Sequence, residues 1–324
     1  MTTLRQLRVN HITELPAEPP AFEESVHQWS QAEIDALIFA EASKRPLLVR
    51  GEPGVGKTQI ARAVAVHCGW CLHAVTIHPR FDPQHLIARF DAVLRLADAQ
   101  AQCLDPTEKS YWTPGPIWQA YDWRGAQAYS KDPEQTQPRG HVILIDEIDK
   151  ADSDLPNSLL ELLGQRSFAF APLGLRLGGP NVPQPLVVIT TNEEREVPAA
   201  FLRRCIVLNL AAGDDYQAWL MARGRAHFAA SRQLADVVLA HAARQLVDDR
   251  SAMQQAGLPP PGASEYLDLM LAVHELAPGD TAAQLAWLDR LSAYSFVKHS
   301  EGAPLTQNRN PVVSAESGSS SAEA

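Results

Sequence analysis

The sequence lacks any apolar run approaching the roughly 18–20 residues that a helix needs to cross a bilayer. Its first residues, MTTLRQLR, contain no apolar signal core, so we expect a cytoplasmic protein with no membrane partner. Positive charge is also scarce, since 28 Lys and Arg residues against 38 Asp and Glu residues leave a net charge of −10. An acidic surface is repelled by phosphodiester backbones, which disfavours a nucleic-acid partner.

Cysteine is rare as well: the chain has four, which fits a reducing compartment. Cys68 and Cys71 form a C-x-x-C pair flanked by His67 and His73, a pattern typical of redox centres and zinc sites. A thioredoxin-like dithiol belongs at a helix start, however, whereas this pair falls at a helix exit with Gly69 as the C-cap. Zinc would need four ligands converging from that helix end and the next strand. We therefore favour buried small residues and a structural His73, with redox or metal chemistry as the alternative.

The most informative stretch runs from Gly51 to Thr58 and fits the phosphate-binding pattern G-x-x-x-x-G-K-[ST] at every specified position. A short buried strand over residues 47–49 precedes it, and a helix over residues 59–67 follows. The glycines let backbone N–H groups turn inward around an anion, and the helix start adds the positive end of its dipole. Lys57 would contact the β- and γ-phosphates, and the Thr58 hydroxyl would ligate Mg²⁺.

These features predict a bound nucleoside triphosphate. The expected nucleotide-binding residues of this stretch are Gly51, Glu52, Pro53, Gly54, Val55, Gly56, Lys57, Thr58 and Gln59.

Two adjacent carboxylates, Asp146 and Glu147, follow the strand predicted over residues 141–145. That strand is apolar on both faces after its first residue, which indicates a central parallel strand covered by helices. Carboxylates at the end of such a strand are costly unless a cation or a reaction uses them. We assign Asp146 to nucleotide binding and the Mg²⁺ shell, and Glu147 to the attacking water. The alternative is a carboxylate pair that caps the next helix.

Three further polar residues follow later strands. Asn192 ends the buried strand predicted over residues 186–191, where its amide could hold the attacking water, although Asn at a strand end is commonly a turn residue. Arg203 and Arg204 lie on a short helix before the strand predicted over residues 205–210. Adjacent arginines on such a helix are commonly solvated.

The remaining patterns define the organisation of the chain. We expect an extended segment over 1–29, an α/β nucleotide-binding domain over 30–212, a helical domain over 213–300 and a disordered tail over 301–324. Within the first domain, Ser30 and Glu33 predict a capping box. Further predictions are helices over 81–102 and 155–163, an aromatic-rich insertion over 105–123, and a hairpin over 168–185. In the second, helices are expected over 215–229, 232–247, 264–277 and 281–299.

The order of these motifs resembles the AAA+ ATPases, and most closely their MoxR group. The matching stretches are residues 45–58 (RPLLVRGEPGVGKT), 114–117 (PGPI), 146–151 (DEIDKA) and 159–163 (LLELL). The resemblance implies a P-loop NTPase AAA+ core, a parallel sheet between helices, with a small C-terminal helical lid. It also implies a ring, usually a hexamer, that binds and hydrolyses ATP with Mg²⁺ between neighbouring subunits.

The resemblance also assigns roles to residues that composition and spacing leave open. Asn192 matches the first sensor position, and Arg204 matches the arginine finger that acts on the next subunit's site. Arg203 occupies the acidic position of the usual pattern, and Arg166 is a reserve candidate for the finger. Tyr266 stands where the family usually carries a second sensor arginine, so we expect weak basal ATPase activity.

MoxR-like ATPases resemble chaperones in use and commonly act with proteins that carry a von Willebrand factor A domain. The leading hypothesis is therefore a ring that remodels or activates a partner protein. A nucleotide-gated signalling switch that assembles with effector or protease partners is the first alternative. A DNA-acting motor is the second, and the net charge of −10 weighs against it.

Overall fold

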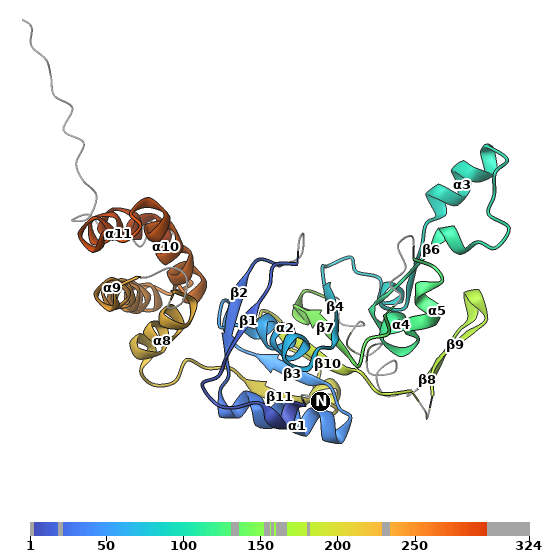
Figure 1. Cartoon of the computed structure of the whole chain (residues 1–324), viewed down its shortest axis with the longest axis horizontal. Coiled ribbons are helices and arrows are strands. Elements are labelled where there is room, and N and C mark those ends of the chain that lie inside the picture. Colours follow the sequence, from blue (N-terminus) through green and yellow to red (C-terminus); the bar gives the residue numbers. More distant parts are fainter. Residues whose placement is uncertain are drawn as a thin grey trace, which may run out of the picture. The chain divides into compact units, whose positions relative to one another are not determined.

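The computed structural model of the chain describes residues 3–18, 22–130, 136–151, 156, 159, 167–179, 182–228 and 234–296 (Figure 1). It divides into two units, residues 1–211 and 212–324. The helix predicted over 155–163 lies outside the described residues apart from Pro156 and Leu159, and Arg166 and the tail lie outside them entirely.

A five-stranded parallel sheet is the centre of the first unit, in the order β11-β3-β10-β7-β4. Its strands are β3 (Leu47–Arg50), β4 (Cys71–Thr76), β7 (His141–Asp146), β10 (Leu186–Thr191) and β11 (Ile206–Asn209). All six residues of β10 are buried, as its continuous apolar run predicts for a strand covered on both faces. Because every strand is parallel, their carboxyl ends meet at one edge of the sheet.

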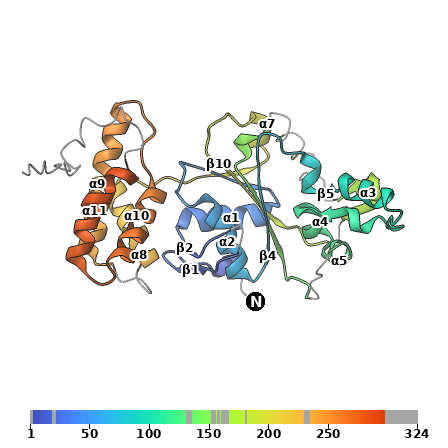
Figure 2. The same ribbon diagram turned by 90° about the horizontal axis from the view of Figure 1, so that it is seen from above.

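Alternate residues of the strands face two separate cores. Leu47 and Val49 pack with the buried faces of α1 (Gln31–Ser43) and α2 (Lys57–Cys68). Leu48 and Ile143 pack on the other face with α4 (Pro116–Tyr121) and α7 (Ala199–Leu202). The predicted fold, a parallel sheet between helices, is confirmed, and Figure 2 shows it from a second direction.

The N-terminal residues form more local structure than their lack of periodicity suggested. A 3-10 turn, η1 (Leu4–Gln6), precedes the antiparallel pair β1 (Ile12–Leu15) and β2 (Ser25–Gln28). Leu15 and Trp29 are buried in the same core as α1 and α2. Helix α1 then begins after Ser30, whose backbone N–H donates to the Glu33 carboxylate at 2.7 Å, so the predicted capping box is confirmed.

The single helix predicted over residues 81–102 is wrong. The structure has instead η2 (Pro83–Leu86), β5 (Ala88–Phe90) and α3 (Ala92–Gln100), followed by η3 (Lys109–Tyr111), β6 (Trp112–Pro114), α4 and α5 (Trp123–Gln127). Phe90 lies in an antiparallel pair with β6, where its ring centroid is 4.7 Å from that of Trp112. Asp91 then caps a new helix by accepting from the backbone N–H of Leu94. Val93 in this helix is 80% exposed.

Two smaller predictions hold. The expected hairpin is β8 (Ser167–Phe170) paired antiparallel with β9 (Leu175–Gly178), joined by η5 (Ala171–Leu173). The second unit contains α8 (Tyr216–Phe228), α9 (Asp236–Gln255), α10 (Ala263–Leu276) and α11 (Thr281–Ser295), which share one apolar core. Within the described ranges no helix is both long and apolar enough to pass through a membrane.

Candidate functional site

The loop between β3 and α2 has a backbone that only glycine accommodates easily. Gly51 has φ +150°, and a Cβ there would lie 2.5 Å from the carbonyl oxygen of Leu210. Gly54 and Gly56 have φ +78° and +99°, in the region that side chains disfavour. Gly56 is also the N-cap of α2, so the 12-residue helix begins directly at the end of the loop. The loop therefore ends at a helix N-terminus, where backbone N–H groups and the helix dipole favour an anion.

Lys57, the first residue of α2, has its ammonium group within this loop. Its Nζ donates to the carbonyl oxygens of Gly51 at 2.7 Å and Glu52 at 2.8 Å, and the residue is 7% exposed. Burial lowers the pKa of Lys57 from its usual value. Four carboxylates oppose this effect, those of Asp146, Asp149, Glu147 and Glu193. An ammonium group has three donors, so one remains to contact a phosphate oxygen.

The structure brings Thr58 of α2 and Asp146 of β7 into contact. The Thr58 hydroxyl lies 3.0 and 3.2 Å from the two carboxylate oxygens of Asp146. A hydroxyl and a carboxylate are hard oxygen ligands of the kind that Mg²⁺ takes. Four carboxylates act on the one ammonium group of Lys57, so negative charge exceeds positive charge among these groups. Thr190 of β10 also donates to Asp146, and its own hydroxyl accepts from the backbone N–H of Glu147 at 2.9 Å. The residues present therefore fit the ion that the nucleotide-binding motif implies.

Glu147 lies between the end of β7 and the next 3-10 helix, with its backbone in the left-handed region. Its φ of +61° is uncommon for a residue with a side chain and is typical of functional sites. One carboxylate oxygen accepts from Lys150 Nζ at 2.7 Å, and the other from the side-chain amide of Asn192 at 3.3 Å. Glu147 precedes the short 3-10 helix η4 (Ile148–Lys150) but makes no side-chain capping bond to it. The Glu147 carboxylate therefore does not cap η4, which had been the alternative interpretation of the sequence.

Asn192 reaches Glu147 because β10 lies between β3 and β7 in the sheet. A residue that sequence reasoning left without a role, Asp149, holds it there. The Asp149 carboxylate is 4% exposed and accepts from the backbone N–H groups of Asn192 at 3.2 Å and Glu194 at 3.1 Å. Asp149 belongs to the same acidic stretch as Asp146 and Glu147. In the sequence, only the apolar residue beside it, Ile148, indicated that this part of the stretch is buried.

Arg203 and Arg204 are both exposed, directly after α7. Within the described part of the chain, neither guanidinium group has a hydrogen-bond or ion-pair partner. Their backbone is fixed by Arg45: its Nε donates to the Arg204 carbonyl at 3.1 Å, and its Nη2 to the carbonyls of Arg203 and of Cys205. The side chains therefore project from a turn whose backbone is held to the end of α1.

Tyr266, at the expected second sensor position, lies on α10 in the core of the helical unit. It is fully buried, and its hydroxyl donates to the carbonyl of Leu239 at 3.2 Å. Burial raises the pKa of Tyr266, so the hydroxyl stays neutral. A Cβ added at Gly224 would lie 2.6 Å from this hydroxyl, which shows how closely α8 packs against the ring. Tyr266 therefore acts as a core residue within its unit.

A phosphate-binding loop at a helix N-terminus, beside paired acidic residues at the carboxyl edge of a parallel sheet, defines the class of P-loop nucleoside triphosphatases. Comparison with known families refines the class. Residues 46–205, just under half of the chain, match the model of the AAA domain of the dynein-related subfamily, so this segment is similar to an AAA domain. Such domains in general bind and hydrolyse nucleotide, and proteins that carry them generally oligomerise.

Solved structures with similarity to the chain include two bacterial proteins. A candidate ATPase from Cytophaga hutchinsonii is 14% identical with a TM-score of 0.41, and the match covers 78% of this chain and 66% of that one. The RuvB Holliday junction branch migration motor of Thermotoga maritima is 15% identical with a TM-score of 0.42, covering 82% of this chain and 71% of that one. Neither likeness bears on function at this level of similarity.

Proposed function

We propose that the chain is a Mg²⁺-dependent ATPase of the MoxR type, acting in the cytoplasm as a ring that remodels or activates a partner protein. One observation carries the proposal: five predicted site residues converge at one edge of the sheet. Thr58 contacts Asp146, Asn192 contacts Glu147, and both carboxylates interact with the charge of Lys57. A glycine-lined loop supplies the backbone donors for the phosphates at the same edge.

In this proposal each residue acts on the γ-phosphate or the water that attacks it. Lys57 stabilises charge on the phosphate oxygens, and Glu147 orients the water and accepts its proton. Asn192, whose side-chain amide is hydrogen-bonded to Glu147, responds to the presence of the γ-phosphate. Thr58 and Asp146 would hold Mg²⁺, which when bound with ATP offsets the charge of the β- and γ-phosphates. Arg204 of one subunit would stabilise charge at the site of the next, with Arg203 and Arg166 as alternatives.

Two features support weak basal activity. The carboxylate oxygens of Glu147 are engaged by Lys150 and by the Asn192 amide, so an attacking water must compete with both for a place beside them. Tyr266 cannot supply a cation to the γ-phosphate, and within its own unit it is buried. These features also favour the second candidate function, a nucleotide-gated switch that hydrolyses ATP once for each assembly event with an effector.

Steady-state and single-turnover kinetics separate these two functions. A remodelling motor releases phosphate continuously at a rate that a client stimulates, whereas a switch gives one turnover per site followed by a much slower phase. Absence of any ATP-dependent turnover in either assay would contradict both. The partner could be a protein with a von Willebrand factor A domain, a proposal that rests on the family resemblance alone.

Replacing Lys150 by Ala is expected to raise the basal rate of ATP hydrolysis by about 1.5–5-fold. A partly exposed ion pair contributes about 0.2–1 kcal/mol, and its loss leaves one carboxylate oxygen of Glu147 open to the attacking water. The measurement is phosphate release at saturating ATP. Lys150→Arg keeps the pair and is the matched control, which should stay near the wild-type rate. An unchanged or lower rate in Lys150→Ala, with the Arg variant normal, would show that the pair does not restrain Glu147.

Replacing Arg45 by Ala is expected to lower kcat about 10-fold and to change the KM for ATP less than 2-fold, because it releases the turn that carries Arg203 and Arg204. Arg8→Ala, which removes an exposed arginine elsewhere, is the control. The double variant Arg45→Ala/Arg204→Ala should be no slower than Arg204→Ala alone, since Arg45 acts through that side chain. Additive losses in the double variant would show that Arg45 has a separate role.

A further inference from the structure

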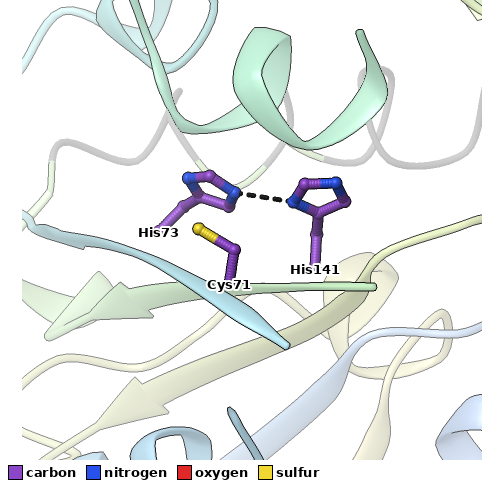
Figure 3. Close-up of side chains that lie close together, drawn as sticks. All are labelled: Cys71, His73 and His141. Carbon is purple, nitrogen blue, oxygen red and sulfur yellow. Dashed lines mark hydrogen bonds between the residues drawn. The ribbon is translucent and has the colours of Figure 1, made fainter. Parts of the chain in front are cut away.

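Three side chains with metal-binding chemistry lie together at the opposite end of the sheet from the phosphate-binding loop. Cys71 and His141 are the first residues of β4 and β7, and they are paired directly across the parallel register. His73 follows Cys71 by two residues, so the strand period of two places both on the same face. Figure 3 shows the Cys71 thiol and the two imidazoles directed toward one another above these strands.

The distances between the three groups are close to those of a metal site. One ligand atom from each residue lies within 4.8 Å of the other two. His73 Nε2 is 2.9 Å from His141 Nδ1. Tetrahedral zinc bonds of about 2.0–2.3 Å place ligand atoms about 3.3–3.6 Å apart. Small side-chain rotations would therefore widen the imidazole pair and draw the thiol inward, with no change in the strands.

The surroundings of the two histidines favour metal ligation over protonation. His73 is 6% exposed, and the ring of Trp123 lies 6.0 Å from it and 5.7 Å from His141, centroid to centroid. Burial, with a smaller contribution from His141, lowers the pKa of His73 to about 4, so its imidazole is neutral and keeps a lone pair. Gln119 hydrogen-bonds to the His73 side chain, the kind of outer contact that orients a ligating imidazole.

We propose that Cys71, His73 and His141 bind one zinc ion that links β4 to β7. A thiolate and two imidazoles are the donors that Zn²⁺ prefers, whereas Mg²⁺ and Ca²⁺ prefer oxygen. A cavity of about 220 Å³ at this end of the sheet has His141 in its lining, so one of the three ligands borders open space, whereas Cys71 and His73 do not line it. The sequence disfavoured zinc because four ligands are needed; in this proposal three come from the protein and a water would be the fourth.

This site differs from the C-x-x-C interpretation of the sequence. Cys68 packs in the core on the other face of the sheet, with α1 and α2, and burial raises the pKa of its thiol to about 11. The partner of Cys71 is instead His141, 70 residues away, through the register of β4 and β7. The site is also separate from ATP hydrolysis, because His141 and Asp146 are at opposite ends of one strand, roughly 16 Å apart at about 3.3 Å per residue. Its role is to hold two strands together.

The test is zinc binding by the full chain, first stripped with EDTA and then titrated with Zn²⁺ in excess Mg²⁺. We expect one zinc per chain by elemental analysis after gel filtration, and an affinity reduced at least about 100-fold in Cys71→Ser and in His141→Gln. Cys103→Ser, which removes an exposed cysteine, is the matched control and should bind like wild type. Wild-type protein that retains no zinc, or a Cys71→Ser variant that retains it equally, would overturn the proposal.

Two readouts on the unaltered protein guard against variants that fail to fold. Co²⁺ in place of Zn²⁺ should give thiolate-to-cobalt charge-transfer absorption, which a site of histidines alone cannot produce. Bound zinc should also protect Cys71 from alkylation, mapped by peptide mass spectrometry, while Cys103 reacts at the same rate with and without the metal. Equal alkylation of Cys71 in both conditions would exclude it as a ligand.

Discussion

Glu147→Gln is expected to lower ATP hydrolysis by about 10²–10⁴-fold while ATP–Mg²⁺ binding stays within a few-fold of wild type. The amide keeps the size of the side chain but cannot accept a proton from water. Binding should persist because Lys57, Thr58 and Asp146 are untouched. The measurements are phosphate release at saturating ATP and, separately, nucleotide titration.

The same variant should also hold the protein in its ATP-bound assembly, seen as a larger mass by light scattering in the presence of ATP. Glu193→Gln is the matched control, because Glu193 faces the same edge of the sheet but is paired with Arg50 at 2.6 Å. It should hydrolyse ATP at close to the wild-type rate. Unchanged hydrolysis in Glu147→Gln would remove Glu147 from the role of base.

Arg204→Ala is expected to lower kcat by about 10³–10⁵-fold, the range typical of an arginine finger. The side chain is exposed and has no partner among the described residues, while its backbone is fixed by Arg45. That combination suits an arginine presented to a neighbouring subunit. Arg203→Ala is the control beside it in the sequence and should lose far less activity. A large loss in Arg203→Ala with a small loss in Arg204→Ala would exchange their roles.

Mixing two inactive variants tests whether the arginine acts between subunits. Lys57→Ala lacks the phosphate contact but keeps the finger, and Arg204→Ala keeps the pocket but lacks the finger. In a ring with head-to-tail contacts, equal mixing restores about a quarter of the interfaces. Activity should therefore return in the mixture and in neither variant alone. A mixture that stays inactive, although light scattering shows mixed assemblies, would contradict action in trans.

The sequence predicted the sheet and the convergence of the acidic pair with the loop, for physical reasons that are local. β10 begins with four consecutive apolar residues, which favours a strand covered on both faces. The loop needs positive φ angles at positions that only glycine fills easily, so the spacing of its glycines in the sequence indicates the loop. Parallel strands then bring Asp146 and Asn192 to the same edge without any knowledge of the register. The chemical roles of these residues remain predictions.

What escaped the sequence depends on contacts that the local pattern does not reveal, most of them between distant residues. The contacts of Asp149 with Asn192 and of Lys150 with Glu147 follow from the left-handed backbone of Glu147 and the 3-10 helix after it. The helix predicted over 81–102 fails because Phe90 packs against Trp112, a partner that periodicity within the segment cannot reveal. The cluster of Cys71 and His141 depends in the same way on strand register, which a one-residue shift would abolish.

The most direct test of the account is calorimetric titration of the full chain with a non-hydrolysable ATP analogue, with Mg²⁺ and with EDTA. The account predicts one site per chain, tighter binding with Mg²⁺, and an affinity reduced about 10–100-fold in Lys57→Ala, since a charge-assisted contact to phosphate is lost. Folded protein that gives no binding heat with the analogue and Mg²⁺, or that binds it equally well in Lys57→Ala, would contradict the account.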